Sequence, residues 1–197
     1  MTAIPDELLE CFENVKDSIN AALAHYQIWF TLRGRGKAID SHLGVMNDHR
    51  YVDFFKAANI AHYKMMFIEA ACAFDTDDRT NRFRRLKTLL RENGYEGHAV
   101  QLEGVVGPYT QLVSNMLTIR SKLIAHKESA ISPEELYARH GIVPDRIGEM
   151  LSLVADAMRE IERTFNDGAS SGTTGATQRW ERATYGLLEV LQNGRGS

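Results

Sequence analysis

An arginine and a histidine stand six residues apart in the segment LTIRSKLIAHKE, residues 117–128. Arg120 stays charged at any physiological pH and offers a planar fork of donors that matches a phosphate group. His126 titrates near neutral pH, so its imidazole can accept a proton in one step and donate it in another. Together the two side chains could perform acid–base chemistry on a bound phosphate ester without a metal ion.

The same segment also has a purely structural interpretation. On an ideal helix, side chains six residues apart point about 120° away from each other. Arg120 and His126 could therefore act together only if the helix ends near Ile124, or if a second copy of the chain supplies the partner. Lys122 and Lys127 add positive charge, and cations near a helix C-terminus are stabilising in themselves.

The elements that would position this pair are predicted to be helices, because apolar residues recur every three or four positions. The sequence favours helices from Pro5 to the RGRGK at 33–37, from about Tyr51 to about Phe74, over 82–93, from Pro108 into the LTIRSKLIAHKE segment, from SPEEL at 132–136, from Ile147 to Phe165, and from Trp180 to Leu191. A polar loop is expected from the RGRGK to about His49. Strand-like alternation is almost absent, so the predicted fold class is all-α, an antiparallel helical bundle with an additional C-terminal helix.

The composition of the chain divides it into three parts. Residues 1–166 carry the bundle pattern, residues 167–178 have the composition of a flexible linker, and residues 179–197 hold a C-terminal amphipathic helix and tail. The expected inward stripe of the second helix consists of Phe54, Ala58, Ala61, Met65, Ile68 and Cys72. Both cysteines, Cys11 and Cys72, are interpreted as buried thiols in a reducing compartment.

The overall charge and the N-terminus narrow the classes of function. The formal net charge is −3, so a nucleic-acid site would have to be a local patch. The first residues, MTAIPDELLE, lack the basic start and apolar run of a signal peptide. No apolar run approaches the roughly 20 residues of a membrane span. The sequence therefore predicts a cytoplasmic protein with no membrane partner.

The run RSKLIAHKE resembles the signature of the HEPN superfamily, the higher eukaryotes and prokaryotes nucleotide-binding domains. That signature is an Arg, usually followed by a polar residue, and then a His after four to six intervening residues. Arg120 and His126 fit with five residues between them, and the run is most similar to the abortive-infection, AbiU-like branch. The resemblance extends over residues 6–166. Where the family often has Asn, Asp or His after the Arg, this chain has Ser121, which can hydrogen-bond but does not titrate near neutrality.

The resemblance implies an all-α bundle and a metal-independent endoribonuclease of the phage-defence or toxin–antitoxin type. Arg120, His126 and Ser121 are then the expected catalytic residues. The family commonly works as a homodimer with a composite site, so a homodimer, an RNA substrate and an antitoxin protein are the expected partners. No cofactor is expected, because the chain has no Gly-rich phosphate loop of the Walker type.

Other residues could support such a site. Candidate RNA-binding cations are Lys122, Lys127, Arg84, Arg85 and Lys87; the alternative for the last three is a solvated face balanced by Asp75, Asp77 and Asp78. Candidate orienting carboxylates for Arg120 are Glu69 and Asp75; the alternatives are a boundary Glu that reaches solvent and a helix-capping Asp. No metal site is predicted, because His42 and His49 are weak ligand candidates.

Two other functions remain compatible with the sequence. A non-catalytic HEPN module that binds RNA or nucleotide needs only Arg120 and the lysines. A bundle that binds a protein partner through its helices needs neither the arginine nor the histidine.

Overall fold

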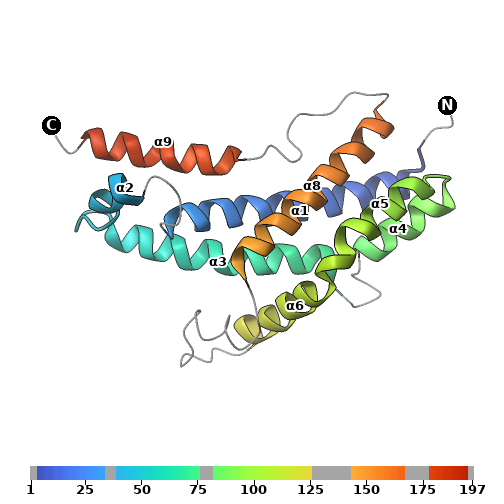
Figure 1. Ribbon diagram of the computed structural model, residues 1–197, viewed down its shortest axis with the longest axis horizontal. Helices are drawn as coiled ribbons and strands as arrows, with labels where there is room; N and C mark the ends of the chain where they lie inside the picture. Colours follow the sequence, from blue (N-terminus) through green and yellow to red (C-terminus); the bar gives the residue numbers. More distant parts are fainter. Residues whose placement is uncertain (1–3, 34–38, 76–81, 126–142, 167–177, 195–197) are drawn as a thin grey trace.

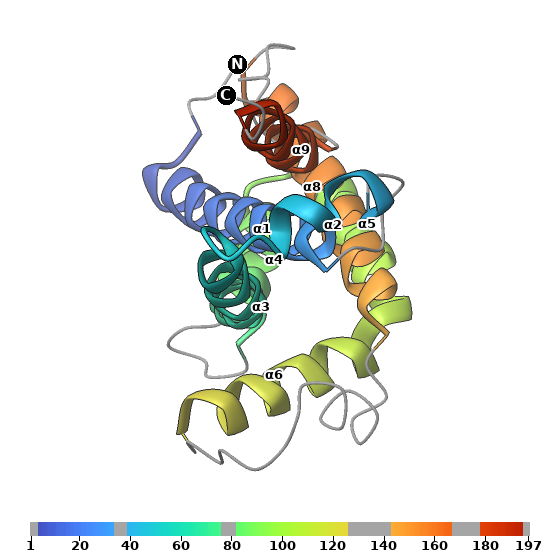
Figure 2. The ribbon, with the colours of Figure 1, turned by 90° about the vertical axis from the view of Figure 1, so that its left-hand side faces the viewer.

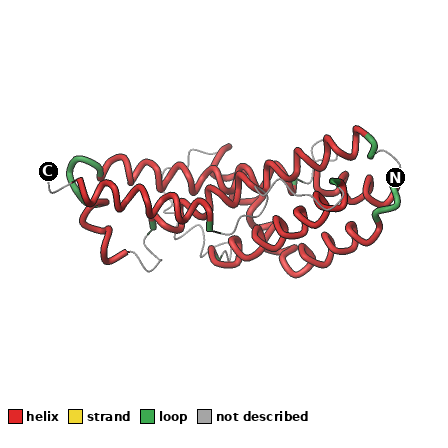
Figure 3. The backbone as a smooth tube through the Cα atoms, turned by 90° about the horizontal axis from the view of Figure 1, so that it is seen from above, coloured by secondary structure: helices red, strands yellow, loops and turns green. Residues whose placement is uncertain are grey.

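The computed structural model describes residues 4–33, 39–75, 82–125, 143–166 and 178–194. In order, the elements are α1 (Asp6–Leu32), α2 (Ile39–Met46), α3 (Val52–Phe74), α4 (Arg82–Glu92), α5 (Glu96–Val106), the 3₁₀ turn η1 (Gly107–Tyr109), α6 (Thr110–Ala125), α8 (Pro144–Phe165) and α9 (Arg179–Asn193). Within these residues there is no strand (Figure 3), so the predicted all-α class is confirmed. None of the described helices has the length and apolarity needed to cross a membrane.

Helix α1 is the central element of the bundle and contacts α3, α4, α8 and α9. It runs antiparallel to α3 along the long axis of the molecule (Figure 1). Its inward stripe matches the periodicity of the sequence, and Leu8, Val15 and Ile19 are completely buried. Helix α8 covers α1 and α5 with the predicted stripe from Ile147 to Phe165, all of which is buried.

Helix α3 buries a different face from the one predicted. The expected stripe began with Phe54, but Phe54 is 62% exposed and its neighbour Phe55 is buried. Cys72, expected in the core, is also exposed, and Cys11 is half-buried. The buried face instead consists of Phe55, Tyr63, Met66, Phe67, Ala70, Ala71, Ala73 and Phe74. Apolar residues occur on every side of this helix, so its spacing does not select one face, and contacts with α1 and α6 decide which residues are buried.

Two helices lie where the sequence predicted a loop or nothing definite. The polar loop expected before His49 contains α2, which packs on α3 and α9. The segment before Gly107 forms α5, and α5 follows α4 after a tight turn at Gly94. The φ of Gly94 is +82°, and the Tyr95 amide donates to the Leu90 carbonyl at 2.8 Å. This is a glycine-terminated helix end, so the helix predicted over 82–93 is confirmed as α4.

The C-terminal helix α9 packs on the bundle, against α1 and α2. The buried side chain of Gln27 on α1 caps it, because its Oε1 accepts hydrogen bonds from the backbone N–H groups of Trp180, at 3.0 Å, and Glu181, at 3.4 Å. Leu188 joins a small second core with Leu32, Val45 and Phe55. The amphipathic helix expected at Trp180–Leu191 is therefore confirmed as part of the folded structure.

Candidate functional site

Arg120 lies near the end of α6, a helix that α3 holds in place through apolar contacts. Its apolar residues Leu112, Met116 and Ile119 are buried and face the core. Figure 2 shows α6 at the edge of the molecule, at a distance from α9. Because Ile119 points inward, the next residue, Arg120, emerges at the border of the helix contact, where its side chain is 35% exposed.

Arg120 forms an ion pair with Asp75 at the C-terminal end of α3. Its Nη1 donates to Oδ2 of Asp75 at 2.7 Å, and the two residues are separated by 45 positions in the chain. The Asp75 side chain is 23% exposed, so both groups are only partly hydrated. A charge-assisted bond of this length fixes the direction of the guanidinium while part of it remains accessible to a ligand.

The sequence offered two carboxylates that could orient Arg120, and the structure brings one of them to it. Glu69 is half-buried on α3, whereas Asp75 makes the bond. Asp75 also occupies the C-cap position of α3. A carboxylate at a helix C-terminus is unfavourable toward the helix dipole, and the cation of Arg120 offsets that cost.

The rest of the Arg–His motif is only partly within the described residues. Helix α6 ends at Ala125. Ser121 and Lys122 are part of this helix, but the structure describes only their backbone. His126 and Lys127 lie outside the described residues, as does the helix expected at 132–136. The predicted roles of these residues therefore remain predictions.

The cations of α4 are engaged with carboxylates of neighbouring helices. Arg85 bonds to Glu7 of α1, and Lys87 bonds to Glu103 of α5 at 3.2 Å. The hydrogen bonds from Arg91 and Lys87 lower the pKa of Glu103. Arg84 is exposed on the same helix. Glu7 and Glu103 thus balance Arg85 and Lys87, and an RNA phosphate would have to compete with them. Asp77 and Asp78 lie outside the described residues.

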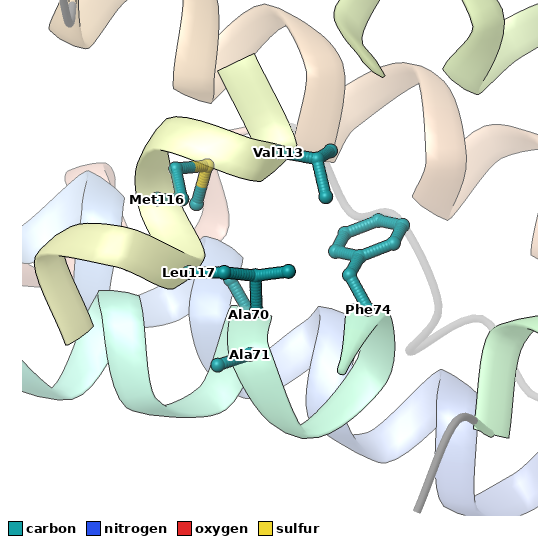
Figure 4. Close-up of a pocket in the computed structure, with 6 residues that line it drawn as sticks. All are labelled: Ala70, Ala71, Phe74, Val113, Met116 and Leu117. Atoms are coloured by element: carbon teal, nitrogen blue, oxygen red, sulfur yellow. The ribbon is translucent and has the colours of Figure 1, made fainter. Parts of the chain in front are cut away.

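A small apolar gap lies between α3 and α6 (Figure 4). Its empty space is about 140 Å³, part of which is open solvent, and its lining is Ala70, Ala71, Phe74, Val113, Met116 and Leu117. Phe74 precedes Asp75, and Leu117 lies one turn before Arg120. Its lining side chains are all apolar, and the gap is too narrow to admit a water molecule, so it is a packing gap between the two helices and not a ligand site.

Two polar pairs join α1 to neighbouring helices, and neither could be predicted from the sequence. Nδ1 of His25 lies 2.7 Å from Nδ1 of His62 on α3, so one imidazole donates and the other accepts. Lys16 bonds to Glu162 of α8 at 3.3 Å, with Glu162 only 3% exposed. Each pair joins residues on two helices, so the sequence contains no local spacing that could have revealed it.

The histidines considered as metal ligands lie in different environments. His42 is buried on α2, whereas the His49 side chain is 91% exposed beside Asp48. Among the described residues no group of three or more His, Cys, Asp or Glu side chains is arranged to hold a metal ion.

Comparison of the chain with family models, with curated proteins and with solved structures finds no match.

Proposed function

We propose that this protein is a metal-independent endoribonuclease of the HEPN type, with Arg120 binding the scissile phosphate and His126 transferring protons. The observation that carries the proposal is the Arg120–Asp75 ion pair. It holds the first residue of the motif in a defined direction at the partly exposed end of α6. An oriented, permanently charged guanidinium is the group that a developing negative charge on phosphate requires.

In the proposed reaction, the 2′-hydroxyl of the RNA attacks the adjacent phosphorus and loses its proton to a histidine. The bond between phosphorus and the 5′-oxygen breaks, and that oxygen takes up a proton. The products are a 2′,3′-cyclic phosphate and a 5′-hydroxyl. Arg120 neutralises the charge on the non-bridging oxygens, and Asp75 is a positioning residue that keeps the guanidinium aligned.

One chain supplies one His126, whereas the reaction needs a base and an acid. A two-fold homodimer would place two Arg–His pairs across a shared groove. In this proposal Ser121, Lys122 and Lys127 border that groove and contact the RNA backbone. A defence or toxin role would require a partner that restrains the activity, such as an antitoxin protein that covers the groove.

A second candidate is a non-catalytic module that binds RNA or nucleotide. The same ion pair is compatible with it, because a guanidinium held by Asp75 and 35% exposed can contact a phosphate without any bond being broken. Ser121 adds to it, since a serine hydroxyl does not titrate near neutral pH. In this candidate Arg120 contacts a phosphate and no bond is broken.

The test is incubation of a mixed RNA with the purified full chain in the presence of a metal chelator. The variants are Arg120→Ala and His126→Ala. The matched control is Arg163→Ala, because Arg163 is a surface arginine of α8 that bonds to Glu160 at 2.7 Å. Cleavage by the wild type and the control, but by neither motif variant, is the expected result. RNA binding without cleavage by the wild type would favour the second candidate.

A further inference from the structure

Two histidines from neighbouring helices face each other between α1 and α3. Nδ1 of His25 and Nδ1 of His62 are 2.7 Å apart, and the centres of the two rings are 4.9 Å apart. The two helices lie side by side (Figure 1), and the rings of Trp29 and Tyr63 pack between them, with centres 5.8 Å apart. This packing fixes the separation of the helix segments that carry the two histidines.

The distance between the two nitrogens is close to the distance between two ligands of one metal ion. With metal–nitrogen bonds of about 2.0–2.1 Å, two nitrogens at a right angle are about 2.9 Å apart, and two at a tetrahedral angle are about 3.3–3.4 Å apart. The observed 2.7 Å lies nearer to the right-angle value. Right angles occur in the square-planar and octahedral coordination of Cu²⁺ and Ni²⁺, and imidazole is a suitable ligand for both ions.

Metal binding requires the two rings to turn and does not require the helices to separate. Without a metal, one Nδ1 donates its proton to the other. Two imidazoles on one ion have ring centres about 4.5 Å apart at a right angle and about 5.2 Å apart at a tetrahedral angle. The observed 4.9 Å lies between these values. The donor ring would lose its Nδ1 proton to water and take one up at Nε2, so it stays neutral and both Nδ1 lone pairs become available.

The protonation state of the pair also suits a metal, because histidine binds metal ions as the neutral imidazole. Burial lowers the pKa of His25, and burial together with the charge of His25 lowers the pKa of His62. Both rings are therefore neutral at neutral pH. The described residues offer no group of three or more His, Cys, Asp or Glu ligands, but both imidazoles are only partly buried, so water can fill the other coordination positions.

We propose that His25 and His62 bind a divalent transition-metal ion, Cu²⁺ most tightly, through their two Nδ1 atoms. The preference for Cu²⁺ follows from the general order of affinities among first-row divalent ions. The bound ion joins α1 to α3. It stabilises the folded chain, because the unfolded chain does not hold the two imidazoles next to each other.

This site is separate from the ion pair of Arg120 and Asp75. His62 and Asp75 are 13 positions apart in the chain, which corresponds to about 20 Å along the axis of α3. The ion therefore takes no part in the proposed cleavage of RNA. The inference does not rest on the ribonuclease activity, and either one can fail without the other.

The experiment is a titration of the metal-free full chain with Cu²⁺ at neutral pH, followed by electron paramagnetic resonance. The wild type is expected to bind an ion with the spectrum of two coordinated nitrogens. His25→Gln and His62→Gln should each raise the dissociation constant at least about tenfold, because one imidazole alone does not chelate. His49→Gln and His98→Gln are the matched controls, since each removes a histidine outside the pair, and both should bind Cu²⁺ as the wild type does.

Urea unfolding gives a second readout, which a hydrogen bond without metal affinity would not change. Added Ni²⁺ should raise the urea midpoint of the wild type and of both controls, and it should not change the midpoint of the double variant His25→Gln/His62→Gln. A wild type that binds Cu²⁺ no more tightly than this double variant overturns the proposal. So does a two-nitrogen spectrum that both single variants retain, because the ion then lies elsewhere.

Discussion

Arg120 on α6 and Asp75 at the end of α3, 45 positions apart in the chain, form an ion pair of 2.7 Å that joins the two helices. The pair closes one end of the apolar contact in which Met116 and Ile119 are buried. The ion pair fixes the direction in which the Arg120 guanidinium points, and the proposed site depends on that orientation.

Replacing Asp75 by Asn is predicted to lower the turnover number for RNA cleavage about tenfold or more, because a misaligned guanidinium stabilises the transition state less well. The Michaelis constant should change little, since Arg120 keeps its charge. Stability should fall by less than about 1 kcal/mol, because the pair is partly exposed. Steady-state kinetics and urea unfolding measure both effects.

The control for this variant is Asp156→Asn, which removes the carboxylate of a surface pair with Arg159 on α8. It should leave turnover unchanged. An Asp75→Asn protein that binds RNA more tightly and turns it over at the wild-type rate would show that Asp75 only masks the charge of Arg120.

The buried pair of Lys16 and Glu162 is predicted to be more important for stability than any surface ion pair. Burial would lower the pKa of Lys16, but the hydrogen bonds and charges of Glu13 and Glu162 outweigh it and raise that pKa. Glu162→Gln leaves a buried ammonium with one exposed partner, and it should cost about 2–4 kcal/mol in the free energy of unfolding.

Glu13→Gln removes the more exposed partner of the same lysine and should cost less than about 1 kcal/mol. Both variants are measured by urea unfolding at neutral pH. Equal losses in the free energy of unfolding for Glu162→Gln and Glu13→Gln would contradict the prediction that the buried partner is the more important one.

Gly148 on α8 is predicted to tolerate no side chain, because the ring of Tyr26 on α1 occupies the space where a Cβ would lie. Gly148→Ala should destabilise the protein by about 1–3 kcal/mol through displacement of that ring. Gly104 on α5 has open space at the same position, so Gly104→Ala should stabilise by up to about 1 kcal/mol through helix propensity. Thermal unfolding of the two variants should shift the midpoint in opposite directions.

The pairing of His25 and His62 predicts a loss of stability in mild acid. Burial lowers the pKa of His25, and burial together with the charge of His25 lowers the pKa of His62. Above the ordinary histidine pKa both rings are neutral in the folded and unfolded states. As the pH falls below it, the unfolded chain takes up protons first, so the free energy of unfolding decreases.

The measurement is urea unfolding at about pH 7.5 and about pH 5.5, on either side of the ordinary histidine pKa. The double variant His25→Leu/His62→Leu should lose less stability between the two values than the wild type. His98→Gln removes a partly exposed histidine that bonds to Thr164 and should behave as the wild type. An unchanged pH dependence in the double variant would exclude the pair as its source.

The helices with one apolar face could be predicted from the sequence, and the others could not. In α8 a single stripe carries most of the apolar residues, and it is buried from Ile147 to Phe165, within the helix that the sequence predicts. In α3 the apolar residues surround the helix, so the prediction chose Phe54 where the fold buries Phe55. Helix α2 was missed because its short sequence lies among glycines and polar residues.

In the candidate site, contacts between residues far apart in the sequence could not be predicted. Asp75 was one of two carboxylates proposed for Arg120, but only the packing of α6 on α3 brings it there. The basic run of α4 was visible in the sequence, whereas its pairing with Glu7 and Glu103 depends on how α1 and α5 pack against it. His126 lies outside the described residues, so its role depends on experiment.

The most direct test of the proposed function is the chemistry of the RNA ends left by the full-length protein in the absence of metal. We predict 2′,3′-cyclic phosphate and 5′-hydroxyl ends with the wild type and with Arg163→Ala. Neither kind of end should appear above background with Arg120→Ala or His126→Ala, while all four proteins give the same circular dichroism spectrum. Intact RNA with the folded wild type, or the same ends from His126→Ala, would contradict the ribonuclease proposal.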